Sequence, residues 1–208
     1  MIPGHHYQER NSDVSIFREK EHEHTFLQQL RDAVLMADEF NAKYLSVFPG
    51  YSRGDENRAW QQSRLVDTLK RGADIVEKRG KVMLIMPVNK VDHPGSIINR
   101  ISEAYQVCRL VERPSCKILY DFYHQQAEAG DLIHNLEMVW DEIGYIVFKD
   151  FPGGMEPGTG EIYFPNILRY LHQQNFQGII GMAHGLSDPS AEGVGKMLGM
   201  YRAMDAAL

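Results

Sequence analysis

The chain has 208 residues, of which 43% are hydrophobic, and its formal net charge is −6. This length and composition allow one sizeable buried core. The acidic balance, without a basic stripe, argues against nucleic-acid binding. No apolar run approaches the roughly 20 residues that a membrane helix needs. We therefore expect a globular protein that binds neither nucleic acid nor membrane.

The N-terminal residues, MIPGHHYQERNSD, are polar, so the sequence predicts a loop over residues 1–13 and no signal peptide. Cys108 and Cys116 are the only cysteines, too few for a disulfide framework in a chain of this length. A reducing cytoplasm is therefore the expected compartment.

Five short apolar segments alternate with helical patterns along the chain. Strands are predicted over residues 44–48, 81–88, 116–122, 145–149 and 178–183. Helices are predicted over residues 25–40, 59–78, 96–111, 125–143 with a break near Gly130, 165–175 and 191–207. Short, nearly all-apolar strands are typical of a parallel sheet covered by crossover helices. We expect an α/β fold with a parallel sheet, although periodicity does not distinguish a barrel from a doubly wound sheet.

The stretch from Tyr145 to Phe164, YIVFKDFPGGMEPGTGEIYF, stands out. An apolar strand is followed by a loop rich in proline and glycine, and then by a helical pattern. Connections of this kind usually have two to six residues, and in parallel α/β folds the chemistry lies on loops after the carboxyl ends of strands. This loop is therefore a candidate for the functional site. A surface loop without a function is the alternative.

Four stretches together resemble one family: LIMPVN (84–89), LYDFYH (119–124), GYIVFKDFPGGMEPGTGEI (144–162) and GIIGMAHGL (178–186). They resemble the hydroxypyruvate isomerases, within the xylose-isomerase-like TIM barrels that also include sugar epimerases. The resemblance covers residues 43 to 194 and implies an eight-stranded β/α barrel. On that fold the five predicted strands are the fourth to the eighth. The expected architecture is thus an incomplete parallel β/α barrel of TIM type, forming one partial barrel domain over residues 1–208.

The resemblance also implies a reaction. Interconverting hydroxypyruvate and tartronate semialdehyde moves a proton between neighbouring carbons through an enediolate. In the family a divalent metal acts as a Lewis acid on the substrate oxygens, and two carboxylates take and return the proton. Oxygen-rich ligation suits Mg²⁺ or Mn²⁺.

The family's four ligand positions fall on Met86, Asp121, Val147 and Ala183, of which only Asp121 matches. Both proton-transfer carboxylates are therefore replaced, and we expect no tightly bound metal in this chain. We also expect all four positions to lie on neighbouring strands and to face one cavity.

The resemblance assigns the remaining site residues. The two catalytic candidates are His124 and Lys149, and the substrate-binding candidates are Asn89, Glu156, Gly158 and Glu161. The structural alternative for His124 is a core histidine bonded to Asp121 or to a backbone carbonyl. For Lys149 the alternative is an ion pair with Asp121.

Three functions follow from these observations. The first is a metal-dependent isomerase acting on a small hydroxy-keto acid or sugar. The second is a non-catalytic relative that serves as a binding or interaction module, and the third is a fragment or engineered form of an isomerase. An open barrel would leave the strands at Tyr44 and Gly178 as exposed edges, so a homo-oligomer is expected.

Overall fold

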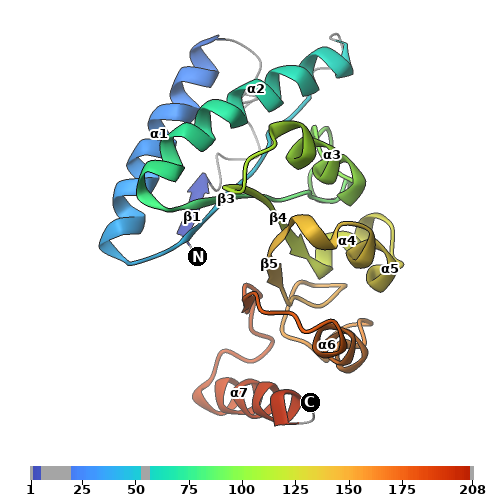
Figure 1. Ribbon diagram of the computed structural model, residues 1–208. Helices are drawn as coiled ribbons and strands as arrows, with labels where there is room; N and C mark the ends of the chain where they lie inside the picture. Colours follow the sequence, from blue (N-terminus) through green and yellow to red (C-terminus); the bar gives the residue numbers. More distant parts are fainter. Residues whose placement is uncertain (1, 6–19, 53–56, 207–208) are drawn as a thin grey trace.

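The computed structural model describes residues 2–5, 20–52 and 57–206, and its centre is a parallel sheet (Figure 1). Neighbouring strands follow the order of the chain. The strands are β1 Ile2–His5, β2 Tyr44–Val47, β3 Val82–Ile85, β4 Cys116–Asp121, β5 Ile143–Val147 and β6 Ile180–Gly181. All five pairings are parallel. Within the described residues β6 does not pair back onto β1, so the sheet is an open part of a barrel.

Helices follow the strands along the chain. They are α1 Lys20–Glu39, α2 Arg58–Val76, α3 Ile101–Val111, α4 Phe122–Glu128, α5 Leu132–Met138, α6 Phe164–Gln173 and α7 Ala191–Ala206, with two 3-10 turns, η1 Glu77–Arg79 and η2 Trp140–Glu142. The break predicted near Gly130 separates α4 from α5. No helix in the described part of the chain is long and apolar enough to cross a membrane.

The first strand corrects the sequence prediction. Residues 1–13 are expected to form a loop, yet Ile2–His5 forms β1 and pairs in parallel with β2. Pro3 and Gly4 are unfavourable in strands, but an edge strand tolerates a proline because one side of its backbone needs no partner. The sheet therefore has six strands rather than five. One edge is β1 rather than the predicted strand at Tyr44, and the other is β6, which is the predicted edge strand at Gly178.

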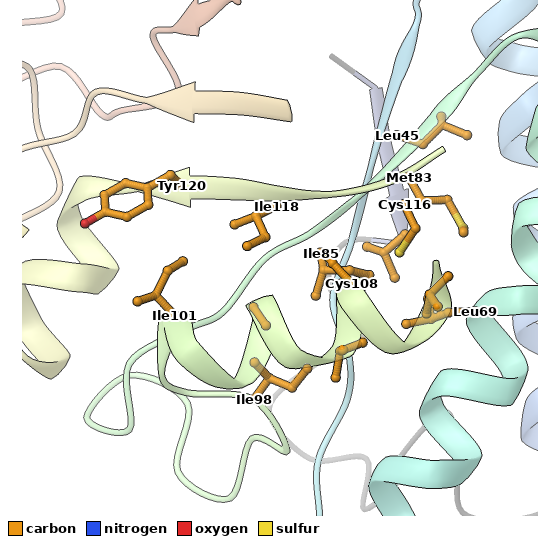
Figure 2. Close-up of a cluster of buried hydrophobic side chains, with 14 of the residues drawn as sticks. Leu45, Leu69, Met83, Ile85, Ile98, Ile101, Cys108, Cys116, Ile118 and Tyr120 are labelled. Atoms are coloured by element: carbon orange, nitrogen blue, oxygen red, sulfur yellow. The ribbon is translucent and has the colours of Figure 1, made fainter. Parts of the chain in front are cut away.

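The sheet has one face covered by helices and one that carries a smaller apolar cluster. Alternate strand residues point to opposite faces, and the helix-covered face holds the main core. In Figure 2 the side chains of Ile85, Cys116 and Ile118 lie against those of Ile101 and Cys108 on α3. Both cysteines are free and buried.

The opposite face corresponds to the interior of a closed barrel. Its buried apolar residues are Leu84, Met86, Val88, Leu119, Tyr145 and Val147, and we refer to them as the inner cluster. Asp121 follows Leu119 at the next position of the same parity, so it lies on this inner face at the carboxyl end of β4. The carboxyl ends of β3, β4 and β5 lead into the candidate site.

Candidate functional site

Segments that follow β3 and β4 meet at a buried histidine. His124 lies on the first turn of α4 and is 5% exposed, and Asn89 follows β3 and is fully buried. The Nδ2 atom of Asn89 lies 2.8 Å from Nδ1 of His124. The backbone N–H of Asn89 donates to the same Nδ1 over 3.3 Å. His124 is therefore held through Asn89, rather than by its side chain bonding to Asp121 or to a backbone carbonyl.

These contacts assign the tautomer of His124. A backbone N–H only donates, so Nδ1 is the acceptor and a neutral ring carries its hydrogen on Nε2. Burial lowers the pKa of His124, which favours the neutral ring. Nε2 makes no hydrogen bond to another residue in the described part of the chain. The ring thus offers one N–H donor to a ligand.

Asp92 and Tyr123 form the second part of the site. One oxygen of Asp92 accepts from Asn89 Nδ2 at 3.0 Å and from the Tyr123 hydroxyl at 2.7 Å. Burial raises the pKa of Asp92, but these two hydrogen bonds and the neighbouring His124 and His93 together more than offset it, so the pKa of Asp92 lies below the ordinary value. Burial and the neighbouring Asp92 raise the pKa of Tyr123 to about 12. Asp92 is thus a carboxylate, and Tyr123 is protonated at neutral pH.

Lys149 follows β5 and brings a positive charge to the same region. Its Nζ lies 4.3 Å from the centre of the Tyr123 ring, a cation–π distance. Lys149 forms no ion pair with any of the described residues, so the predicted alternative of a pair with Asp121 is wrong. The carboxylate of Asp121 instead caps α4, accepting from the backbone N–H groups of Tyr123 and His124.

The family's metal-ligand positions do not form an oxygen-rich site. Asp121 and Val147 are register partners on β4 and β5, and Met86 and Val147 belong to the inner cluster. Ala183 lies two residues beyond β6 and is exposed. Among the residues with described side chains, no group of three or more His, Cys, Asp or Glu is placed to hold a metal. The residues present do not fit a hard cation with six or more oxygen ligands, and the convergence of Ala183 with the other three stays a prediction.

The long loop after Lys149 is organised by Asp150, which sequence reasoning did not assign to the site. The Asp150 carboxylate is fully buried and accepts four backbone N–H groups. Oδ1 accepts from Phe151 and Ile162, and Oδ2 accepts from Gly158 and Gly160. The adjacency of Asp150 to Lys149 and the closely spaced glycines were the signals in the sequence.

The predicted substrate-binding residues of the loop mainly make contacts within the protein. Glu156 accepts from the backbone N–H and the hydroxyl of Ser187, which lower its pKa. Glu161 accepts from Gln126 at 2.9 Å. The N–H of Gly158 is used by Asp150 at 2.8 Å. Their roles toward a ligand stay predictions.

An aromatic wall adjoins His124 on the side of β2. The His93 ring lies 5.7 Å from the His124 ring and 5.7 Å from the ring of Phe48. The Tyr51 hydroxyl lies 3.5 Å from Nδ1 of His93. These residues extend the site beyond those expected from the sequence, because loop packing rather than spacing brings them together.

Two clefts lie away from this constellation. One of about 410 Å³ is at the amino ends of the strands, where Lys43, Lys117 and Gly178 contribute to its lining. The other, of about 370 Å³, lies between α6, β6 and α7. Neither is lined by His124 or Lys149, so we place the site by the polar side chains that meet at the carboxyl ends of β3, β4 and β5.

A parallel β/α sheet with polar side chains at the carboxyl ends of its strands defines a protein of the β/α-barrel class. Residues 9–204 match the model of the xylose isomerase-like TIM barrel family. The chain belongs to this family.

Two curated relatives that the chain matches are isomerases. The chain is 32% identical over 120 residues to the hydroxypyruvate isomerase of Escherichia coli (strain K12), covering 56% of this chain and 45% of that protein. It is 27% identical over 151 residues to the 2-oxo-tetronate isomerase of Cupriavidus necator, covering 73% of this chain and 58% of the relative. The chain thus spans about half the length of these curated relatives.

Solved structures agree on the fold. The AP endonuclease, family 2, of Brucella melitensis superposes with a TM-score of 0.76 at 22% identity, covering 89% of this chain and 71% of that chain. The 3-keto-D-glucoside 4-epimerase of E. coli gives a TM-score of 0.78 at 21% identity, covering 93% of this chain and 76% of that chain. At these identities the likeness establishes the fold alone.

Proposed function

We propose that this chain is a non-catalytic relative of the hydroxypyruvate isomerases. In this proposal it binds a small hydroxy-keto acid or sugar at the carboxyl ends of β3, β4 and β5, without metal-assisted turnover. The observation that carries the proposal is the replacement of three family ligand positions by Met86, Val147 and Ala183. The remaining carboxylate, Asp121, caps α4.

Electrostatics explains why the replaced positions are apolar. Once one ligand is lost, the other buried carboxylates lack a counter-ion, which costs several kcal/mol. Met86 is 9% exposed and Val147 is 2% exposed, so a charge at either position would be poorly hydrated. Apolar side chains at both positions relieve this cost and pack into the inner cluster.

The retained polar groups suit an oxygen-rich, anionic ligand. His124 offers an N–H through Nε2, and Lys149 brings an ammonium group that has no carboxylate partner in the described structure. A charged donor of this kind forms strong hydrogen bonds to a carboxylate. A ligand with a carboxylate beside a carbonyl or hydroxyl group therefore matches both donors.

A second candidate function is residual isomerisation with His124 as a lone base. The lowered pKa of His124 supports it, because a neutral ring can accept a proton. The hydrogen-bond pattern favours binding instead. Nδ1 already accepts from Asn89, and Nε2 carries the hydrogen, so the ring meets a ligand as a donor.

Restoring the ligand positions tests the loss of catalysis. Metal titration by calorimetry and an isomerase assay with hydroxypyruvate would compare the natural chain with the combined Met86→Glu, Val147→Gln and Ala183→Glu variant. We expect no tight Mg²⁺ or Mn²⁺ binding in the natural chain and measurable binding in the triple variant, since Asp121 supplies the fourth ligand. Single restorations should do little. Metal-dependent turnover by the natural chain would overturn the proposal.

Ligand binding is tested separately with Lys149→Met. We expect hydroxypyruvate to bind the natural chain and to bind the variant about tenfold or more weakly, the loss typical of one charged hydrogen bond. Lys196→Met is the matched control, because Lys196 is an exposed lysine on α7 that pairs with Glu192. Equal affinity in Lys149→Met and the control would exclude Lys149 from the site.

A further inference from the structure

We infer that Asp150 is a positioning residue for the site, because its buried carboxylate holds loop 151–162 and thereby places Lys149 against Tyr123. The part of this inference that concerns a ligand rests on the proposed function. The part that concerns the loop and Lys149 does not. No residue of the loop needs to touch a ligand for this role.

The first step is the carboxylate itself. Asp150 is 0% exposed, yet it forms no ion pair with a described residue. Its two oxygens accept four backbone N–H groups at 2.8–3.1 Å. Hydrogen bonds to a charged acceptor are about twice as strong as neutral ones, so the loop backbone takes the place of a counter-ion.

The second step is the reach of these bonds along the chain. Phe151 begins the loop and Ile162 ends it, and both donate to the same oxygen, Oδ1. The backbone reinforces this closure, since Asp150 N–H donates to Met155 at 2.9 Å and Glu161 N–H donates to Phe151 at 2.7 Å. The side chain of Asp150, the residue next to Lys149, thus binds both ends of the loop and the glycines between them.

The third step connects the loop to Lys149. A Cβ atom placed on Gly154 would lie 2.8 Å from Cε of Lys149, so the bare backbone of the loop packs directly on this side chain. The ammonium group of the same lysine lies over the Tyr123 ring, with Nζ 4.3 Å from the ring centre. If the loop moves, the backbone that packs on Lys149 moves with it.

The fourth step extends the effect to the segment after β6. The carbonyl of Gly154 accepts from Gly185 at 2.8 Å, and Glu156 accepts from the backbone and hydroxyl of Ser187. The loop therefore connects the end of β5 with the chain that leads into α7. Among the described residues, only the buried carboxylate of Asp150 accepts hydrogen bonds from four amides of the loop. Asp150 is therefore the residue that we would substitute.

The test uses the full chain with Asp150→Asn, which keeps the shape but removes the charge and one acceptor. Amide exchange measured by NMR should rise about 10- to 100-fold at Phe151, Gly158, Gly160 and Ile162, the effect of losing hydrogen bonds to a charged group. Exchange in β4 should change little. Asp141→Asn, which alters an exposed carboxylate paired with Arg109, is the matched control and should leave the loop amides unchanged.

A spectroscopic signature separates positioning from general loosening. Nζ of Lys149 lies over the Tyr123 ring, so we expect the ring current to shift the protons of the adjacent methylene group upfield in the natural chain. In Asp150→Asn these signals should return toward the values of a free lysine. An unchanged Lys149 shift, with the loop amides exchanging faster, would overturn the claim that Asp150 positions Lys149.

A measurement on the natural chain covers the case in which Asp150→Asn fails to fold. With increasing urea below the unfolding midpoint, the four amides held by Asp150 should open together with one common free energy. Independent opening would overturn the inference. The affinity for hydroxypyruvate gives the last readout, with an expected loss of about tenfold in Asp150→Asn. If the natural chain does not bind hydroxypyruvate, the proposed function fails, while the exchange and lysine-shift results still decide the role of Asp150.

Discussion

At the scale of single residues, the site is defined by which protons its side chains carry. His124 is buried and receives two hydrogen bonds on Nδ1, so its neutral form is favoured. Asp92 is charged because Asn89 and Tyr123 donate to it. Asn89 joins these two groups through one amide. A change in the charge of His124 therefore acts on a network rather than on an isolated ring.

The lowered pKa of His124 predicts a pH-dependent stability. A histidine whose folded pKa lies below its unfolded value of about 6.5 stabilises the fold above that pH. This contribution is lost as the pH falls from about 6.5 through the folded pKa, because the unfolded chain binds the proton more readily. When the pH is lowered from above about 6.5 to below the folded pKa, the urea midpoint of unfolding should therefore fall more for the natural chain than for His124→Gln.

The control for this measurement is His172→Gln on the exposed end of α6. The urea midpoint of His172→Gln should change with pH as it does in the natural chain, because the His172 ring is exposed in the fold. If His124→Gln shows the same pH slope as the natural chain, the assigned neutral state of His124 in the fold is wrong.

At the scale of elements, loop 151–162 packs tightly around one glycine, Gly160. A Cβ atom on Gly160 would lie 2.2 Å from the carbonyl oxygen of Phe151 and 2.6 Å from Oδ1 of Asp150. Both contacts are with groups that are held in place by the loop's own hydrogen bonds. The loop therefore has no flexible side chain that could move aside at this position.

We predict that Gly160→Ala lowers the free energy of unfolding by about 1–3 kcal/mol, the usual cost of overpacking. Gly195→Ala on α7 is the control, since nothing lies within 4 Å of a Cβ atom at that position. It should stabilise α7 by about 0.5–1 kcal/mol, because glycine is unfavourable inside helices. Chemical denaturation of the three proteins measures both effects, and equal stability of Gly160→Ala and the natural chain would contradict the packing argument.

At the scale of the whole molecule, the described sheet has two free edges. Strand β1 pairs only with β2, and β6 pairs only with β5 among the described residues. The β6 edge is flanked by Ile179 and Met182, which are 48% and 54% exposed. Unpaired strand edges beside apolar side chains favour association with another chain.

We therefore expect the chain to self-associate through the unpaired strand edges at β1 and β6. A stable dimer typically buries about 1,200–2,000 Å² in total. Sedimentation velocity over a range of concentrations would detect it, and Met182→Glu should weaken it. Leu110→Glu on α3 is the control, because Leu110 is similarly exposed on a helix that packs against β4, an inner strand of the sheet. A monomer with cooperative unfolding at all concentrations would contradict the expectation.

The sequence by itself determined the order of helices and strands from α1 onward and the family to which the chain belongs. Apolar runs and the turn residues that bound them reflect local conformational preference, so the positions of β2 to β6 were predicted close to where the structure has them. The resemblance to the isomerase family brought Asp121, His124 and Lys149 to attention, and the proline and glycine residues after a predicted strand marked the long loop.

Only the tertiary structure decided what these residues contact. Strand β1 contains Pro3 and Gly4 and forms through backbone pairing with β2, which no local pattern shows. The bond between Asn89 and His124 joins residues 35 positions apart, and the carboxylate of Asp150 meets amides as far away as Ile162. Hydrogen bonds and buried charges depend on distance in space, and the sequence records only distance along the chain, so the protonation of His124 and the role of Asp150 emerge only in the folded molecule.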